Sequence, residues 1–188
     1  MDKLKCYIII GIFFTIIAGV IGHFVYEWTG ENFITGLFFP VNESTWEHMK
    51  LVFFPMLLYS FFVKYKLKDE SECISKLFML GILAGTFVLP VLFYTYSGVL
   101  GYNIAWLNIL TFIVSVIIGF VVVYVKAKSC MSDRWLLLLN GIVFSLVIAF
   151  MVFSYYPPAI GIFNEKNIDI TGNQTMFNVN CTFNDEKY

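Results

Sequence analysis

The stretch FFPVNESTWEHMK at residues 38–50 places two carboxylates, a histidine, a lysine and an amide in its last nine residues. It stands directly before an apolar run at 51–63, whose 13 residues would cover, as a helix, only about 20 Å of a hydrocarbon core about 30 Å thick. A helix that spans a bilayer here must therefore begin near Ser44. Glu47, His48 and Lys50 then lie at membrane depth, where charge is costly and usually faces a cavity or a partner.

The composition of the whole chain agrees with a membrane location. The 188 residues are 59% hydrophobic and 19% aromatic, and only 13% are charged, which gives a mean hydropathy of +0.79. Soluble domains carry about 25% charged residues, so this chain is predicted to be an integral membrane protein. The formal net charge of −1 argues against nucleic acid as a partner and leaves the lipid bilayer as the expected one.

Five apolar segments reach the length of about 20 residues that a spanning helix needs, at 6–26, 44–63, 77–98, 104–125 and 135–156. They predict an all-α integral membrane protein, with a bundle of five transmembrane helices in a domain at 1–158 and a small extracytoplasmic tail at 159–188. Alternating apolar residues around the turn dipeptide Gly172-Asn173 favour a β-hairpin in the tail, with disorder as the alternative.

The basic residues predict the orientation of the bundle, because cytoplasmic loops are enriched in lysine and arginine. With the N-terminus inside, nine of them fall on the cytoplasmic side and three on the outer side, namely Lys50, Lys166 and Lys187. We therefore expect a cell-membrane protein with a cytoplasmic N-terminus and an extracytoplasmic C-terminus. Three cysteines would lie on the cytoplasmic side, where thiols stay reduced, namely Cys6, Cys73 and Cys130. No intramolecular disulfide is therefore expected.

Two other patterns bear on how the bundle is assembled. Gly81–Gly85 and Ser115–Gly119 have small residues four apart, which allow helices to approach closely. Packing within the bundle is the favoured interpretation, and a homodimer is the alternative. The apolar piece at 33–39 is too short to span and predicts an interfacial or re-entrant element that folds over the outer end of the bundle.

Polar residues gather at the outer ends of the first two predicted spans. His23 and Glu27 are four apart on the first span, and Glu43 and Glu47 are four apart at the start of the second. Because the two spans are antiparallel and joined by a short loop, these groups should lie at one depth. We predict a ligand-binding site for a small ligand, an ion or a lipid headgroup, roofed by the loop at 29–42 and formed by His23, Glu27, Asn42, Glu43, Glu47, His48, Lys50 and Tyr94. Asn108 and Tyr155 fall at the same depth.

The same residues suggest a divalent metal site. Imidazole and carboxylate suit zinc, manganese or iron, and the expected ligands are His23, Glu27, Glu47 and His48. An open coordination position would let such a site activate water, so a membrane-embedded metal-dependent hydrolase is the alternative function. The chain has no HExxH motif that would favour that chemistry.

A purely structural interpretation explains part of the cluster. Ser44-Thr45-Trp46-Glu47 matches a capping box, and Glu47 with Lys50 makes an ion pair three residues apart. These roles do not account for His23, Glu27 or His48. A structural or accessory membrane subunit without chemistry is the third reading of the chain.

The motifs HFVYEW at 23–28 and PVNESTWEHMK at 40–50 also carry a resemblance. Together with Phe54-Pro55, Phe93–Gly98 and Tyr156-Pro157-Pro158, they resemble a family of small bacterial multi-pass membrane proteins of unknown function with an HxxYEW…PVNESxWEHxK signature. The resemblance reaches to about Phe163. It implies a bacterial cytoplasmic-membrane location, and it implies no reaction and no catalytic residue.

Overall fold

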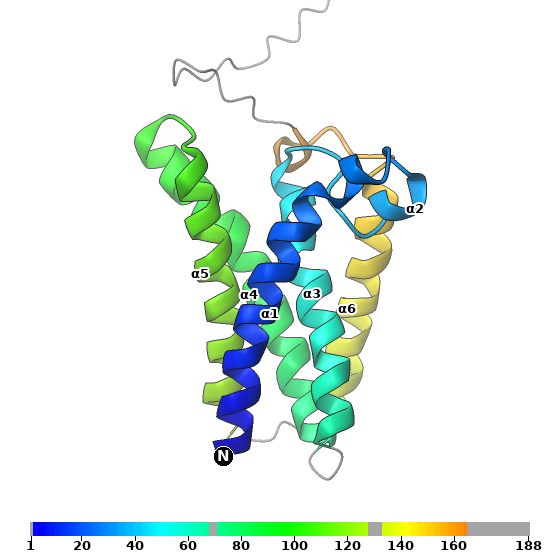
Figure 1. The fold of residues 1–188 in the computed structure, drawn as a ribbon, viewed down its shortest axis with the longest axis vertical. Coiled ribbons are helices and arrows are strands. Elements are labelled where there is room, and N and C mark those ends of the chain that lie inside the picture. Colours follow the sequence, from blue (N-terminus) through cyan, green and yellow to red (C-terminus); the bar gives the residue numbers. More distant parts are fainter. Residues whose placement is uncertain (1, 68–70, 128–132, 165–188) are drawn as a thin grey trace, which may run out of the picture.

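A computed structural model describes residues 2–67, 71–127 and 133–164, and this part of the chain is helical throughout its regular structure. Five long helices run side by side along the long axis of the molecule (Figure 1). They are α1 (Asp2–Trp28), α3 (Thr45–Lys66), α4 (Ser71–Leu100), α5 (Ala105–Lys126) and α6 (Asp133–Phe153). The single turn α2 (Phe33–Gly36) and the 3-10 turn η2 (Gly161–Phe163) lie at one end of the bundle.

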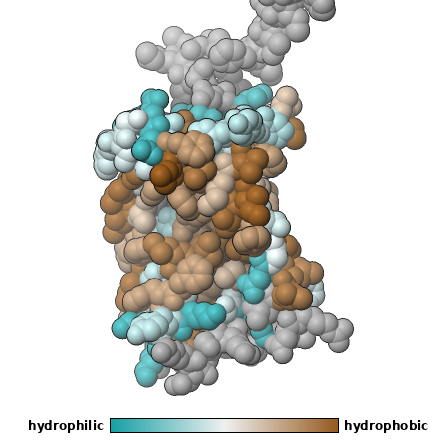
Figure 2. Space-filling model, turned by 90° about the vertical axis from the view of Figure 1, so that its right-hand side faces the viewer, coloured by the Kyte–Doolittle hydropathy of each residue, from teal (hydrophilic) through white to brown (hydrophobic). Residues whose placement is uncertain are grey.

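Within the described residues, three helices are long and apolar enough to cross a membrane, at Lys3–Trp28, Cys73–Leu100 and Ala105–Lys126. The apolar part of α6, Leu137–Phe153, is shorter, and α3 is not among the three. On the face shown in Figure 2, hydrophobic residues cover the middle of the molecule and hydrophilic residues gather towards its two ends. The prediction of an all-α protein with helices apolar enough to span a membrane is thus confirmed for the described residues, and three of the five predicted spans meet this criterion. The predicted β-hairpin around Gly172-Asn173 falls outside the described residues.

Helix α3 lies at the centre of the bundle and packs against both α1 and α4. Its Val52, Phe53 and Met56 are completely buried, and so are Phe78 of α4 and Phe120 of α5. Burying a large apolar side chain contributes about 1.5–3 kcal/mol in water, and in a bilayer the same close packing acts through van der Waals contact. The contact between α1 and α3 confirms that the first two predicted spans are neighbours.

The small residues of α4 and α5 meet directly. A Cβ added at Gly81 would stand 2.6 Å from the carbonyl oxygen of Gly119, and one added at Gly119 would stand 2.9 Å from that of Gly81. Any side chain at either position would force the two backbones apart. The small-residue patterns therefore serve packing within the bundle, as predicted.

The chain reverses sharply after α1 and folds back over the end of the bundle. Gly30 and Glu31 both adopt positive φ angles, of 69° and 58°, and the Asn32 side chain then accepts a hydrogen bond from the Ile34 backbone N–H at 2.8 Å to start α2. The Tyr155 hydroxyl, just after α6, donates to the Phe33 carbonyl at 2.9 Å. The predicted element at 33–39 thus includes a single helical turn that is docked against the end of α6.

The state of the cysteines differs from the expectation. Cys6 is a free thiol, but Cys73 is disulfide-bonded. The prediction that no intramolecular disulfide forms is therefore wrong. Cysteine count and predicted side of the membrane could not reveal it, because the pairing of cysteines depends on the tertiary fold.

Candidate functional site

The start of α3 separates two carboxylates that look equivalent in the sequence. Ser44 is the N-cap residue, with extended backbone angles, and its hydroxyl accepts a hydrogen bond from the Glu47 N–H at 3.3 Å. Half of the predicted capping box is therefore present. The Ser44 N–H donates to the Asn42 side-chain oxygen at 3.0 Å instead of to Glu47. Because Glu43 precedes the N-cap, it lies outside the helix and does not share a helical face with Glu47.

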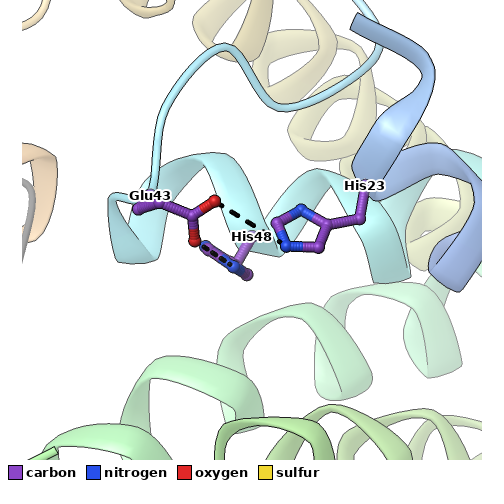
Figure 3. Close-up of side chains that lie close together, drawn as sticks. All are labelled: His23, Glu43 and His48. Carbon is purple, nitrogen blue, oxygen red and sulfur yellow. Dashed lines mark ion pairs between the residues drawn. The ribbon is translucent and has the colours of Figure 1, made fainter. Parts of the chain in front are cut away.

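Glu43 instead joins the two histidines of the chain (Figure 3). One carboxylate oxygen lies 3.7 Å from Nε2 of His23, on α1, and the other lies 3.4 Å from Nε2 of His48, on α3. The two imidazole rings are 5.2 Å apart between centroids. One ligand atom from each of the three residues falls within 4.8 Å of the other two. Three separate segments thus converge on one point, which is within reach of a single metal ion.

A backbone hydrogen bond fixes the orientation of the His48 ring. Nδ1 of His48 lies 2.9 Å from the carbonyl oxygen of Ser44. A carbonyl only accepts hydrogen bonds, so Nδ1 carries the proton and Nε2 is directed at Glu43. Metal-binding histidines commonly have this arrangement, in which one ring nitrogen donates to a carbonyl and the other binds the ion.

Glu47 and Lys50 form a second polar cluster, which is completely enclosed. Lys50 Nζ lies 2.7 Å from a Glu47 carboxylate oxygen, and both side chains are buried. The ammonium also donates to the carbonyls of Gly36 at 2.9 Å and Phe39 at 3.3 Å, and to the Ser154 hydroxyl at 2.5 Å. Glu47 accepts hydrogen bonds from the Val41 N–H and from the Ser154 hydroxyl, both at 3.0 Å. The pair therefore ties α3 to the 33–44 loop and to the end of α6.

The other predicted site residues are not part of the group formed by His23, Glu43 and His48. Glu27 is exposed on α1, and Tyr94 donates a hydrogen bond to the Gly161 carbonyl at 3.3 Å. Asn42 supports the turn before α3. Of the four predicted metal ligands, the structure brings together His23 and His48, adds Glu43, and assigns Glu47 to the Lys50 pair.

A cavity of about 240 Å³ opens beside Glu43 and His48. Its other walls come from the N-terminal half of α3, from α4, and from the start of α5, which includes Asn108. The sequence predicts Asn108 at this depth, but it does not predict that Asn103 lines the cavity. Nothing in the sequence marks Ser154 as a partner of Lys50, because a serine at the end of a predicted helix is common.

Comparison with known sequences identifies a family. The family described as "Family of unknown function (DUF6512)" matches residues 1–176, and the chain belongs to it. The match extends beyond Phe163, where the resemblance in the sequence was expected to end. Neither a curated protein nor a solved structure matches the chain.

Proposed function

We propose that this member of a family of unknown function is an integral membrane protein that binds one divalent transition-metal ion through His23, Glu43 and His48. The observation that carries the proposal is the convergence of the three side chains, from α1, the preceding loop and α3, with ligand atoms within 4.8 Å of one another. Two histidines and one glutamate are a common ligand set of zinc sites that keep an open position.

The distances favour an ion over a direct ion pair. A charge-assisted N–H···O contact is about 2.7–2.9 Å long, and the two histidine–glutamate distances are 3.7 and 3.4 Å. In a tetrahedral zinc site with bonds of about 2.0–2.1 Å, neighbouring ligand atoms lie roughly 3.3 Å apart. The two histidine–glutamate separations are close to that value, although each involves a different Glu43 oxygen. One ligand atom from each residue lies within 4.8 Å of the others, so an ion would draw the three side chains closer together.

The surroundings of the cluster also suit an ion. His23 and His48 are partly exposed, and the Glu43 side chain is 64% exposed, so an ion can reach it. The hydrogen bond to the Ser44 carbonyl holds the His48 ring before any ion arrives. A preorganised ring loses less freedom on binding, which raises affinity.

Five membrane crossings with a cytoplasmic N-terminus complete the proposal. The axes of the five long helices lie side by side, which supports five crossings (Figure 1). The lysine and arginine bias supports the cytoplasmic N-terminus. This orientation puts the metal site on the extracytoplasmic side of a bacterial cell membrane. The disulfide at Cys73 weighs against this orientation, because disulfides persist in oxidising compartments. A reporter enzyme that is active only outside the cytoplasm, fused after Tyr188, should be active, and an inactive but stable fusion would reverse the orientation.

Metal analysis of the purified protein tests the proposed function. The full chain, loaded with zinc and desalted, should retain one ion per chain. His23→Ala and His48→Ala should each weaken zinc binding by more than about 100-fold, since even the loss of a residue that only supports a ligand costs 10–100-fold. Glu27→Gln, which removes an exposed carboxylate on the same helix as His23, is the matched control and should retain the ion. Zinc retention by both histidine variants would overturn the proposal.

Hydrolysis by a metal-bound water is the second candidate function, favoured by the cavity beside Glu43 and His48. Among the described residues that line this cavity, Glu43 is the only acidic one. A hydrolase would therefore need Glu43 to act both as a metal ligand and as the proton acceptor, so metal binding without hydrolysis is the simpler proposal. Zinc-dependent cleavage of a nitrophenyl ester by the wild type, lost in His48→Ala, would favour the hydrolase.

A further inference from the structure

The cavity beside the metal cluster has two chemically different walls. One wall carries Glu43 and His48, two of the three proposed metal ligands. The α4 and α5 ribbons lie across from them (Figure 3), and the side chains that line the cavity from these helices and from α3 include four large apolar ones, Leu51, Leu89, Phe93 and Phe112. A molecule in the cavity would therefore meet the ion at one end and an apolar surface along its length.

The polar groups on the walls are neutral apart from the metal ligands. Thr45, Asn103, Asn108 and Thr111 supply hydroxyl and amide groups, and no lysine or arginine is among the described residues that line the cavity. Sites for phosphate groups usually contain arginine or lysine, because a doubly charged anion needs positive partners. The lining therefore disfavours a phosphate as the occupant.

The charge of the loaded site favours a single negative charge. A divalent ion bound by neutral imidazoles and one carboxylate leaves one net positive charge beside the cavity. A monoanionic oxygen ligand in the open position would neutralise it. A carboxylate provides that charge and leaves a second oxygen to accept hydrogen bonds.

The two asparagines can serve that second oxygen. Asn103 and Asn108 both contact the Tyr96 hydroxyl, which anchors their side chains at the edge of the cavity. Each amide also has two N–H donors. The volume of about 240 Å³ exceeds the cavity of about 150 Å³ that holds benzene in an engineered protein, so the cavity has room for a short hydrocarbon chain.

We propose that this cavity binds a small monocarboxylate with an apolar chain, whose carboxylate completes the coordination of the metal ion and whose chain lies against Phe93 and Phe112. The proposal rests on the proposed function, because it needs the ion at His23, Glu43 and His48. It adds the chemical class of the ligand that the loaded site accepts.

The test uses the full chain loaded with Co²⁺, whose visible absorption reports changes in coordination. Butyrate should change the spectrum saturably. The same concentration of 1-butanol, which has the chain without the carboxylate, should leave it unchanged, and inorganic phosphate should bind at least tenfold more weakly than butyrate. A loaded protein whose spectrum does not respond to butyrate, or that prefers phosphate, would overturn the inference while leaving the metal site intact. Absence of cobalt binding would instead contradict the proposed function.

Two variants locate the carboxylate in the cavity. Leu89→Trp fills the apolar wall and should reduce butyrate affinity at least tenfold without changing cobalt binding, with Leu138→Trp at an exposed position of α6 as the control. Asn108→Leu, compared with Asn140→Leu at another exposed position of α6, removes the amide donors and serves as the second variant if Leu89→Trp does not fold. Unchanged butyrate affinity in the folded variants would contradict the assignment.

Discussion

His48 and Glu47 are adjacent in the sequence, yet they belong to two clusters with opposite properties. His48 faces Glu43 and His23 in a partly exposed group that borders a cavity. Glu47 faces Lys50 and Ser154 in a group that is closed to solvent. Successive residues of a helix point about 100° apart, so one turn of α3 can serve both clusters.

The two clusters differ in how many of their polar groups already have hydrogen-bond partners. Lys50 has four oxygen atoms around its ammonium, and Glu47 accepts from a backbone N–H, a hydroxyl and the lysine. No hydrogen-bonding group of the pair is left for a ligand, so the role of the buried pair is to hold α3 to the neighbouring segments. The histidine cluster has nitrogen–oxygen distances too long for direct charge-assisted hydrogen bonds and has room beside it. A functional site is expected where polar groups are gathered but not yet satisfied.

Breaking the buried pair should have the largest effect. Lys50→Met leaves the Glu47 carboxylate buried without its partner, and the loss of one member of such a pair typically costs about 3–5 kcal/mol. Unfolding in detergent should show this loss. Lys64→Met, at an exposed position of the same helix, should change stability by less than about 0.5 kcal/mol. Equal stability of the two variants would show that the pair is not a structural tie.

The docking of the α2 turn should be the next most sensitive feature. A Cβ at Gly36 would stand 2.2 Å from the Tyr155 hydroxyl oxygen and 2.7 Å from a Val41 methyl group. Gly36→Ala should therefore cost about 1–3 kcal/mol, as overpacking usually does. Gly98→Ala is the control, because its Cβ would meet no atom within 4 Å. Adding Tyr155→Phe to Gly36→Ala should recover part of the loss, and no recovery would place the strain elsewhere.

The cluster of His23, Glu43 and His48 should contribute least to the stability of the metal-free protein. Glu43→Gln should change unfolding in the absence of metal by less than about 0.5 kcal/mol, because the side chain is largely exposed. Zinc at 100 times its dissociation constant should stabilise the wild type and Glu27→Gln by about 2.7 kcal/mol. The same zinc concentration should leave Glu43→Gln nearly unchanged, and equal stabilisation of all three proteins would remove Glu43 from the site.

The sequence was sufficient for the helical class, for a polar cluster at one end of the first two long helices and for the pairing of Glu47 with Lys50. It could not separate Glu43 from Glu47, because a spacing of four implies a shared face only when both residues are helical. The N-cap at Ser44 falls between them and releases Glu43 toward the histidines. The capping box pointed to this boundary, since Ser44 was already its first residue.

Contacts between residues far apart in the sequence could not be predicted from the sequence. Ser154 joins the Lys50 cluster from a position 104 residues away, and the disulfide at Cys73 also depends on the tertiary fold. Helix α3 has Glu47 and Lys50 in its first turns. Because these charged residues lower the hydropathy of the helix, hydropathy alone could not show how α3 lies relative to a membrane. These features depend on how helices pack, which local patterns do not encode.

X-ray absorption spectroscopy at the zinc edge tests the central claim most directly. The zinc-loaded full chain should show two imidazole ligands and oxygen ligands at about 2.0–2.2 Å. The imidazole contribution should fall to one ring in His48→Ala. Sulfur at about 2.3 Å, or a shell of oxygen alone, would contradict a metal site at His23, Glu43 and His48.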